Sequence, residues 1–373
     1  MADITECYSE FIKIENFLNL VIKILTFSFF PRKILFGLEK YTFPVVLIYY
    51  FLSIIIAFIY LNGTILEAVM VIEIFLGVVQ VLVKLLTVLI NEKDLYELLL
   101  WIRGLHQDCT FNAIRQSVET HFSTIQFFIR IFTKIICVLY NMAAAGVIAY
   151  AIYTNLVIFA IPWIPVKQNE SNIYHHINQA FILPSITIIA TPCEYILITI
   201  GSYIIAIQNI FHDMIKQLDN SNLENKKKVL KTIYIFHCKI LKNLKMFNDV
   251  YSFVFTIQAL SSAVIIMLLF YIIRIETNLI FIPLVLGIYL QFSLLCIFGE
   301  LIYSKTANIF VDLYLTKWYE FDLSDQKVFL MMMRASQNPF GLKAAGMYDI
   351  NIVMFIQVVK AGFSFCAILY TFT

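Results

Sequence analysis

The sequence is poor in charged residues and in residues that interrupt helices. Only 14% of its 373 residues are charged, and it contains 11 glycines and 8 prolines. A soluble domain is typically about one quarter charged and about half apolar, whereas this chain is 61% hydrophobic. So much apolar surface needs lipid as its solvent, and the composition therefore predicts an integral membrane protein. A net charge of +2 is too small to indicate a nucleic-acid partner.

Motifs for catalysis, metal binding and secretion are also missing. The sequence has no H-E-x-x-H, G-x-S-x-G or phosphate-binding loop, so we expect no enzyme. Its seven cysteines form no C-x-x-C pair, and we expect neither a cofactor nor a metal. The pair His175-His176 is better explained as surface histidines. Asp3, Glu6 and Glu10 replace the basic cluster of a signal peptide, so no cleavable one is expected.

Long apolar segments are what the sequence has instead. A spanning helix needs about 20 mostly apolar residues. Seven segments meet this requirement: 43–61, 65–90, 126–160, 179–211, 250–274, 278–303 and 348–372. The apolar segment 16–30 is too short, and within the N-terminal region 1–42 it predicts an interfacial or re-entrant helix. We therefore expect an all-α membrane protein with seven transmembrane helices.

Lysine and arginine are distributed very unevenly between the connecting segments. If the N-terminus is cytosolic, 21 of the 27 basic residues fall in cytosolic segments and two, Lys167 and Arg274, fall outside. The positive-inside rule then predicts a cytosolic N-terminus and an extracellular C-terminus. Two possible N-glycosylation triplets, at Asn62 and Asn169, both fall in segments predicted to be extracellular. This topology is the inverse of that of a G-protein-coupled receptor.

Two polar stretches interrupt the apolar segments on the cytosolic side. Residues 212–249, within the region 43–303 that carries helices 1 to 6, predict helical extensions into the cytosol. Residues 304–347 include the run DLSDQKVFLMMMRASQ, in which Ser324 is a candidate N-cap with Asp325 in the first turn. The run presents an apolar face of Val328, Phe329 and Met332. That face either packs against helices of other subunits or folds back on its own chain.

The last apolar segment, 348–373, carries a narrow polar stripe. At about 100° per residue, Lys360, Ser364, Ile368 and Thr371 all fall within about 60° of Gln357. Polar side chains inside a membrane usually face protein or water. A polar stripe interrupted by Ile368 fits a pore with an apolar gate, or a seam against neighbouring helices.

A few charged residues lie within the apolar segments, namely Glu73, Lys84, Glu194 and Glu300. An ionisable side chain inside a membrane is costly unless it is neutral or paired with an opposite charge. Glu73 and Glu194 either line a wet cavity or make buried hydrogen bonds, and for Glu194 and Glu300 we favour the structural role. Small residues at 143–146, followed by Tyr150 and Tyr153, indicate either tight helix packing or a cavity for a small apolar ligand.

The C-terminal third carries a set of residues that is specific in combination: Phe298-Gly299-Glu300, Tyr314, Trp318, Arg334, Gln337, Pro339, Ala345-Gly346, Lys360 and Phe363-Ser364-Phe365. This set resembles the C-terminal signature of insect odorant receptors. The family often has tyrosine where this chain has Phe363 and Phe365. The chain also lacks the long cytosolic insertion of the family's shared co-receptor (Orco), so it resembles a ligand-tuned subunit.

The resemblance implies a ligand-gated, non-selective cation channel opened by a small volatile odorant, without a G protein. It implies a heterotetramer with Orco in the plasma membrane of an olfactory neuron, surrounded by lipid and joined through a cytosolic anchor. The implied anchor residues are Trp318, Val328, Phe329 and Met332. The implied pore and gate residues are Gln357, Lys360, Ser364, Ile368, Thr371 and Phe372, with the gate at Ile368. The implied odorant pocket comprises Val71, Ile74, Ala143, Gly146, Tyr150, Ile188, Ile288 and Tyr289.

Two alternatives stay open from the sequence. A gustatory receptor has the same fold and acts as a homomeric channel, although Phe363-Ser364-Phe365 does not reproduce its last-helix pattern. A secondary transporter predicts inverted repeats and broken helices. We find no internal repeat, and only Pro184 and Pro192 could break a helix in the middle of the membrane.

Overall fold

The computed structural model describes residues 2–28, 39–60, 65–107, 115–166, 172–218, 223–275, 279–344, 346 and 348–372. Their main helices are α1 (Ala2–Leu25), α2 (Thr42–Ile59), α3 (Ile65–Ile90), α4 (Glu92–Gln107), α5 (Arg115–Tyr153), α6 (Ile173–Leu218), α7 (Leu223–Ile275), α8 (Ile282–Leu315), α9 (Leu323–Ser336) and α10 (Ile352–Phe372). Short 3-10 helices cover Glu39–Tyr41, Leu279–Phe281 and Trp318–Glu320. Strands β1 (Lys343–Ala344) and β2 (Tyr348–Asp349) pair antiparallel just before α10. The all-α architecture predicted from the sequence is confirmed.

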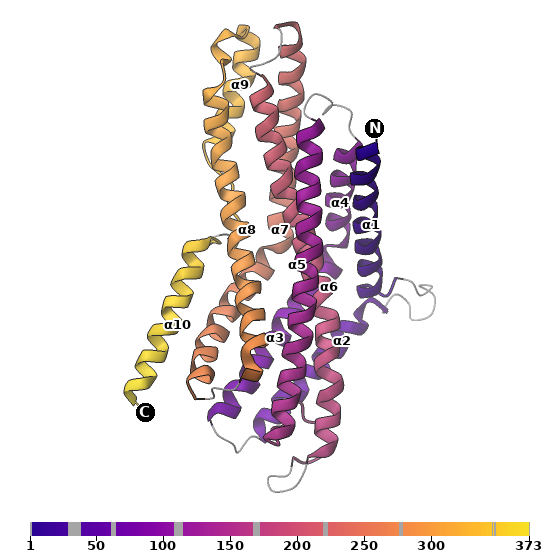
Figure 1. Cartoon of the computed structure of the whole chain (residues 1–373), viewed down its shortest axis with the longest axis vertical. Coiled ribbons are helices and arrows are strands. Elements are labelled where there is room, and N and C mark those ends of the chain that lie inside the picture. Colours follow the sequence, from indigo (N-terminus) through magenta and orange to yellow (C-terminus); the bar gives the residue numbers. More distant parts are fainter. Residues whose placement is uncertain are drawn as a thin grey trace.

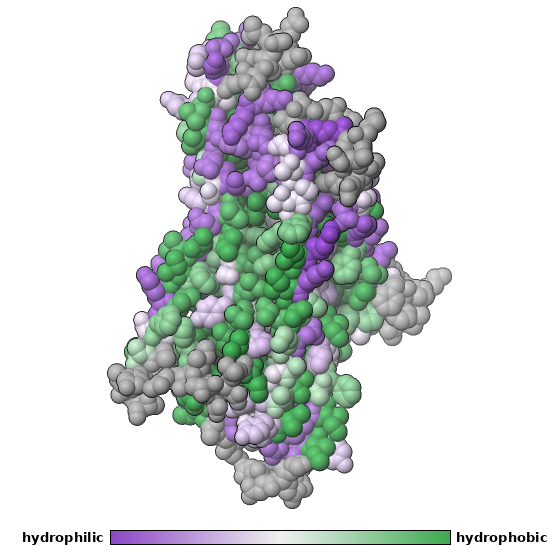
Figure 2. Space-filling model, in the orientation of Figure 1, coloured by the Kyte–Doolittle hydropathy of each residue, from purple (hydrophilic) through white to green (hydrophobic). Residues whose placement is uncertain are grey.

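The long helices α5, α6, α7 and α8 run side by side along the length of the molecule (Figure 1). Helix α9 and the N-terminus lie at one end, and the C-terminus lies toward the other. On the face shown in Figure 2, hydrophilic side chains gather at the end that carries α9, and hydrophobic side chains dominate the middle. This division fits a bundle that crosses a membrane with one end in water.

Membrane-length helices are numerous in the described part of the chain. Six are long and apolar enough to cross a membrane: Glu39–Ile59, Ile65–Ile90, Arg115–Tyr153, Ile173–Leu218, Lys227–Ile272 and Ile282–Leu315. The protein is therefore an integral multi-pass membrane protein. Helix α10 has 21 residues, which suffices for a bilayer core of about 30 Å. The count of seven spans stays a prediction.

Helix α5 ends earlier than the sequence predicts. The apolar pattern continues to residue 160, but the helix stops at Tyr153, and Asn155 adopts a left-handed conformation with φ +56°. The N–H of Leu156 then donates to the carbonyl of Ala151 at 2.9 Å, which is the closing bond of a Schellman motif. The next five residues, 156–160, are buried without being helical. Their apolar character reflects this burial and not a longer span.

Three further differences concern the cytosol-predicted segments. Helix α1 begins at Ala2, well before the short apolar segment 16–30. Its buried residues recur on one face from Phe11 to Leu25, and the helix packs against α5 and α6. The predicted loop 91–122 contains the whole of α4. Helix α9 has Asp322 at its N-cap, so Ser324 lies inside the first turn. The stretch 212–249 is helical on both sides of a gap, since α6 reaches Leu218 and α7 begins at Leu223.

Candidate ligand cavity

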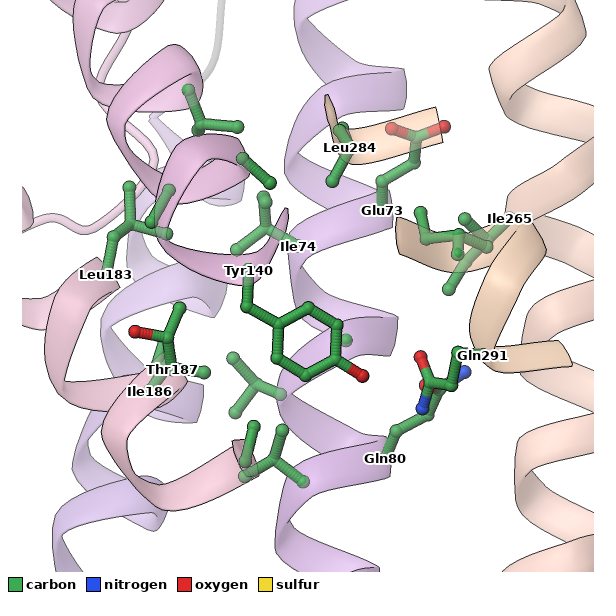
Figure 3. A pocket seen from close by; sticks show the side chains of 18 of the residues that line it. Glu73, Ile74, Gln80, Tyr140, Leu183, Ile186, Thr187, Ile265, Leu284 and Gln291 are labelled. Carbon is green, nitrogen blue, oxygen red and sulfur yellow. The ribbon is translucent and has the colours of Figure 1, made fainter. Parts of the chain in front are cut away.

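Helices α3, α5, α6, α7 and α8 enclose a cavity of about 160 Å³ (Figure 3). Its walls are mostly apolar and include Ile74, Val78, Ala144, Leu183 and Ile265. An apolar cavity of about 150 Å³ stays dry and accepts a molecule the size of benzene. Burial of apolar ligand surface contributes about 25 cal/mol per Å². The cavity can therefore hold one small, mostly apolar molecule.

One end of the cavity is lined by a buried ion pair between Lys84 on α3 and Glu194 on α6. The two side chains are only 5% and 4% exposed. Glu194 Oε1 also accepts hydrogen bonds from Gln291 Nε2 on α8 at 2.7 Å and from the Tyr140 hydroxyl on α5 at 3.3 Å. A buried charge is tolerated when it is paired and hydrogen-bonded. Glu194 therefore has the structural role that we favoured from the sequence.

The polar network continues from this ion pair to helix α7. Gln291 Nε2 lies 3.5 Å from Gln80 Oε1, and Gln80 Nε2 donates to the hydroxyl oxygen of Ser261 at 2.6 Å. Gln80 and Lys84 belong to one stripe of α3, together with Glu73 and Gly77, at spacings of four, three and four residues. This spacing places them on one helix face. The sequence prediction missed this stripe, although its spacing is visible in the sequence and marks the face of α3 that lines the cavity.

The opposite end of the same stripe carries Glu73. This side chain lines the cavity and is 5% exposed. Its Oε1 atom is buried and has no hydrogen-bond partner in the part of the chain that the structure describes. Figure 3 shows Glu73 beside Leu284 and well away from Gln80 and Gln291. The cavity therefore has one polar end whose hydrogen bonds are made and another where an acceptor oxygen is left over.

Three residues of the predicted odorant pocket, Ile74, Ala143 and Ile288, line this cavity. The other five do not line it. Val71 and Tyr150 lie in an adjacent buried cluster with Phe159 and Phe281. Gly146 contacts Ile280, Tyr289 contacts Phe270 and Phe355, and Ile188 is 67% exposed. Helix α6 contributes Leu183, Ile186, Thr187, Ala190 and Glu194 to the cavity in place of Ile188.

Helix α10 exposes its polar stripe. Gln357, Lys360, Ser364 and Ile368 are all exposed, and Ile368 retains 55% of its accessible surface. The opposite face packs on α7 and α8, where the Phe355 ring lies 5.7 Å from the ring of Phe292. The stripe is therefore not a seam against the helices of its own chain. Thr371 and Phe372 belong to α10 by backbone, and nothing further is described for their side chains.

A glycine sets the distance between α10 and α7. A β-carbon at Gly362 would lie 2.7 Å from ring atoms of Phe270, and the Phe270 ring also contacts Phe363, with centroids 4.4 Å apart. Only glycine allows this approach without a shift of the aromatic ring. Gly362 and Phe363, which precede Ser364, thus hold α10 against the bundle while its polar stripe faces outward.

The predicted anchor residues lie mainly inside their own chain. Phe329 and Met332 are 0% and 1% exposed, and Val328 is half-buried. Trp318 stacks on Phe329 with ring centroids 6.5 Å apart and an interplanar angle of 9°. The apolar face of α9 thus folds back on α7 and α8. The exposed apolar side chains of this region are different ones, including Leu323, Leu330 and Met331.

Three observations bear on the remaining predictions from the sequence. Asn62 and Asn169 lie outside the described residues, so their glycosylation stays a prediction. No group of three or more histidine, cysteine, aspartate or glutamate side chains suited to a metal ion occurs in the described ranges. Helix α6 runs without a break through Pro184 and Pro192, which removes the broken helix that a transporter would need.

A profile of the 7tm odorant receptor family matches residues 64–363. The chain belongs to this family. The match covers α3 to α9 and the first part of α10, and therefore includes the cavity and, of the polar stripe, Gln357 and Lys360. This protein is thus an odorant receptor, a kind of receptor and not an enzyme. The resemblance noted in the C-terminal third of the sequence is confirmed.

Solved structures of an insect olfactory receptor have the same fold as this odorant receptor. They are OR5 from Machilis hrabei, with a TM-score of 0.77, and the same receptor in complex with eugenol, with a TM-score of 0.72. In both comparisons the sequence identity is 16%, and the alignment covers 98% of this chain and 100% of the other. Among curated proteins, none matches this chain by sequence. The similarity therefore concerns the fold alone.

Proposed function

We propose that this odorant receptor is a ligand-tuned subunit of a non-selective cation channel that opens when a small volatile molecule enters the cavity. The observation that carries the proposal is the polar stripe of α10, which is exposed on the outside of its own bundle. Polar side chains are costly in lipid. A stripe with Gln357, Lys360 and Ser364 is stable in a membrane when it lines water between several copies of the helix.

The proposed assembly is a heterotetramer with the co-receptor Orco in the plasma membrane of an olfactory neuron. Its N-terminus is cytosolic and its C-terminus extracellular, as the distribution of lysine and arginine indicates. Ile368 is the gate, with Thr371 and Phe372 at the outer mouth. Because Phe329 and Met332 are buried in their own chain, the α9 surface offered to other subunits is the exposed set Leu323, Leu330 and Met331.

Whole-cell recording tests this proposal. Cells express the chain alone or with Orco, and a volatile panel that includes eugenol is applied, because a receptor of the same fold was solved with that compound. We expect a fast, non-selective cation current only in the presence of Orco. A current from the chain alone would favour the homomeric, gustatory-type alternative. No current despite confirmed surface expression would overturn the channel assignment, and a flux measurement would then test transport.

A further inference from the structure

The buried Oε1 atom of Glu73 indicates which functional group a ligand of the cavity carries. Its Oε1 atom is buried at the cavity wall without a hydrogen-bond partner among the described residues, while Lys84, Glu194, Gln291 and Gln80 at the other end are hydrogen-bonded. Gln80, the nearest member of that network on α3, is seven positions from Glu73, or about 10 Å along the helix axis. The two polar ends are therefore too far apart to satisfy each other.

Leaving a buried acceptor unsatisfied costs about 1–3 kcal/mol. An ordered water needs two to four polar partners, and the labelled neighbours of Glu73 in Figure 3, Ile74 and Leu284, are apolar. Space is available one turn along the same helix, where a β-carbon at Gly77 would meet no atom within 4 Å. The wall beyond consists of small residues, Ala143 and Ala144. This corner of the cavity thus combines free volume, apolar walls and one free acceptor.

We infer that the ligand is a small apolar molecule with a hydroxyl group, which donates its hydrogen to Oε1 of Glu73. The hydrocarbon part lies along Gly77, Ala143 and Ala144. A hydroxyl group suits this position because it donates and accepts, and so complements the carboxyl group in either protonation state. A hydrocarbon of equal size makes no hydrogen bond to Oε1, and an ether of equal size has no donor to offer when Oε1 acts as an acceptor. This inference rests on the proposed role of the cavity as the ligand site.

A binding experiment on the full-length chain in nanodiscs tests the inference without relying on channel activity. The probes are hexanol and its isomer methyl pentyl ether, which have the same atoms and differ in the hydroxyl donor. Affinity is obtained from the ligand-dependent rise of the unfolding temperature, with empty nanodiscs correcting for partitioning into lipid. We expect hexanol to bind the unmodified receptor about tenfold more tightly than the ether, which is the effect of one hydrogen bond.

Two substitutions of similar size separate the hydrogen bond from packing. Glu73→Met removes the acceptor, and we expect hexanol and the ether to bind this variant equally. Glu73→Gln retains a carbonyl oxygen that accepts from a hydroxyl, and we expect the preference for hexanol to persist. Equal binding of the two isomers by the unmodified receptor, or a hexanol preference that survives Glu73→Met, would overturn the inference.

Hexylamine serves as the third probe because a carboxylate could instead attract a cation. Binding of hexylamine more tightly than hexanol, with that preference lost in Glu73→Gln, would overturn the hydroxyl assignment in favour of charge pairing. The binding measurement tests the hydroxyl inference, and the current measurement tests the channel proposal. Hydroxyl-selective binding without current would uphold the inference and contradict the channel proposal, whereas current without hydroxyl selectivity would do the reverse. If Glu73→Met does not fold, the isomer comparison in the unmodified receptor and in Glu73→Gln decides.

Discussion

Gly299 of α8 lies directly against the backbone carbonyl of Ile350, so that a β-carbon at position 299 would overlap with that oxygen. The segment that crosses over it is held in place, because the N–H of Ile350 donates to the carbonyl of Leu342 at 3.0 Å. This crossing is where the chain leaves the end that carries α9 and enters α10. Gly299 thus fixes the starting point of the helix that carries the polar stripe.

Gly299→Ala is therefore expected to destabilise the receptor by about 1–3 kcal/mol, because the backbone at Ile350 has to move. The measurement is the unfolding temperature of the purified protein, together with surface expression. Gly287→Ala on the same helix is the matched control, since its β-carbon would meet Tyr140 at an ordinary 3.8 Å. That control should be neutral or slightly stabilising, because alanine favours a helix more than glycine does. Equal stability of both variants would contradict the close contact.

The ion pair between Lys84 and Glu194 leads to a prediction about charge balance. Lys84→Met leaves Glu194 buried without its cation and should lower the free energy of unfolding by about 3–5 kcal/mol. The double variant Lys84→Met/Glu194→Gln removes both charges and keeps a carbonyl oxygen for Gln291 and Tyr140. It should be more stable than Lys84→Met alone. Thermal unfolding of the three proteins decides, and an unchanged Lys84→Met protein would show that the pair contributes nothing.

Filling the cavity should compete with the ligand. Gly77→Leu places a side chain in the open space at the cavity wall, and we expect it to raise the half-maximal odorant concentration at least about tenfold as apolar contact area for the ligand is lost. Gly104→Leu on α4 is the control, because its β-carbon also has open space but lies away from the cavity. Concentration–response currents measure both. Equal sensitivity of the two variants would exclude this cavity as the odorant site.

Substitution of the proposed gate should alter the closed state. Ile368→Ala removes most of an apolar side chain from the exposed stripe of α10, and we expect an increased basal current through the heteromeric channel. Ile352→Ala on the same helix, at about 140° from Gln357, is the control and should leave the basal current unchanged. Unchanged basal and odorant-evoked currents in Ile368→Ala would remove Ile368 from the gate.

His106 of α4 should make stability depend on pH. Its ring lies between those of Phe11 and Phe122, each with centroids 4.2 Å away, and burial lowers the pKa of His106 to about 3. In the unfolded chain the pKa is near 6.5. The unfolded state therefore binds the proton first as the pH falls below 6.5, and stability decreases by about 1.4 kcal/mol per pH unit in that range.

The variant His106→Phe keeps the aromatic stacking and removes the titrating group. Between about pH 7 and pH 5 it should lose less stability than the unmodified receptor. At neutral pH it should be at least as stable, because the substitution removes a buried nitrogen that has no hydrogen-bond partner among the described residues. Unfolding temperatures of both proteins across this range provide the measurement. Parallel curves for the two proteins would show that His106 does not contribute to the pH dependence.

Much of the helical architecture could be predicted from the sequence. The segment 65–90 coincides with α3 at both ends, because a long apolar run with few breakers has one stable form in lipid. The error at α5 shows the limit of this reasoning. Residues 156–160 are as apolar as a membrane span, but they are buried in the bundle without forming a helix. Asn155, in a left-handed conformation, ends α5 before them.

The cavity was only partly predictable. The sequence indicated Glu73, Lys84 and Glu194 as ionisable residues within apolar segments. It did not show that Glu194 contacts Lys84, which lies 110 residues earlier in the chain. Nor did it separate Ile188, which points outward, from Thr187, which lines the cavity. Neighbouring residues on a helix differ by about 100° in direction, so a positional transfer that is wrong by one residue changes the face.

The sequence by itself determined that this chain is a helical membrane protein. Its long apolar runs need lipid as their solvent, and in lipid a helix satisfies their backbone hydrogen bonds. The sequence also determined the polar stripe of the last helix and the family signature around Lys360. The tertiary structure decided which polar residues are satisfied by partners and which are not. Partnership depends on contacts between helices distant in the chain, and those contacts pair Lys84 with Glu194 but give the Oε1 atom of Glu73 no partner among the described residues.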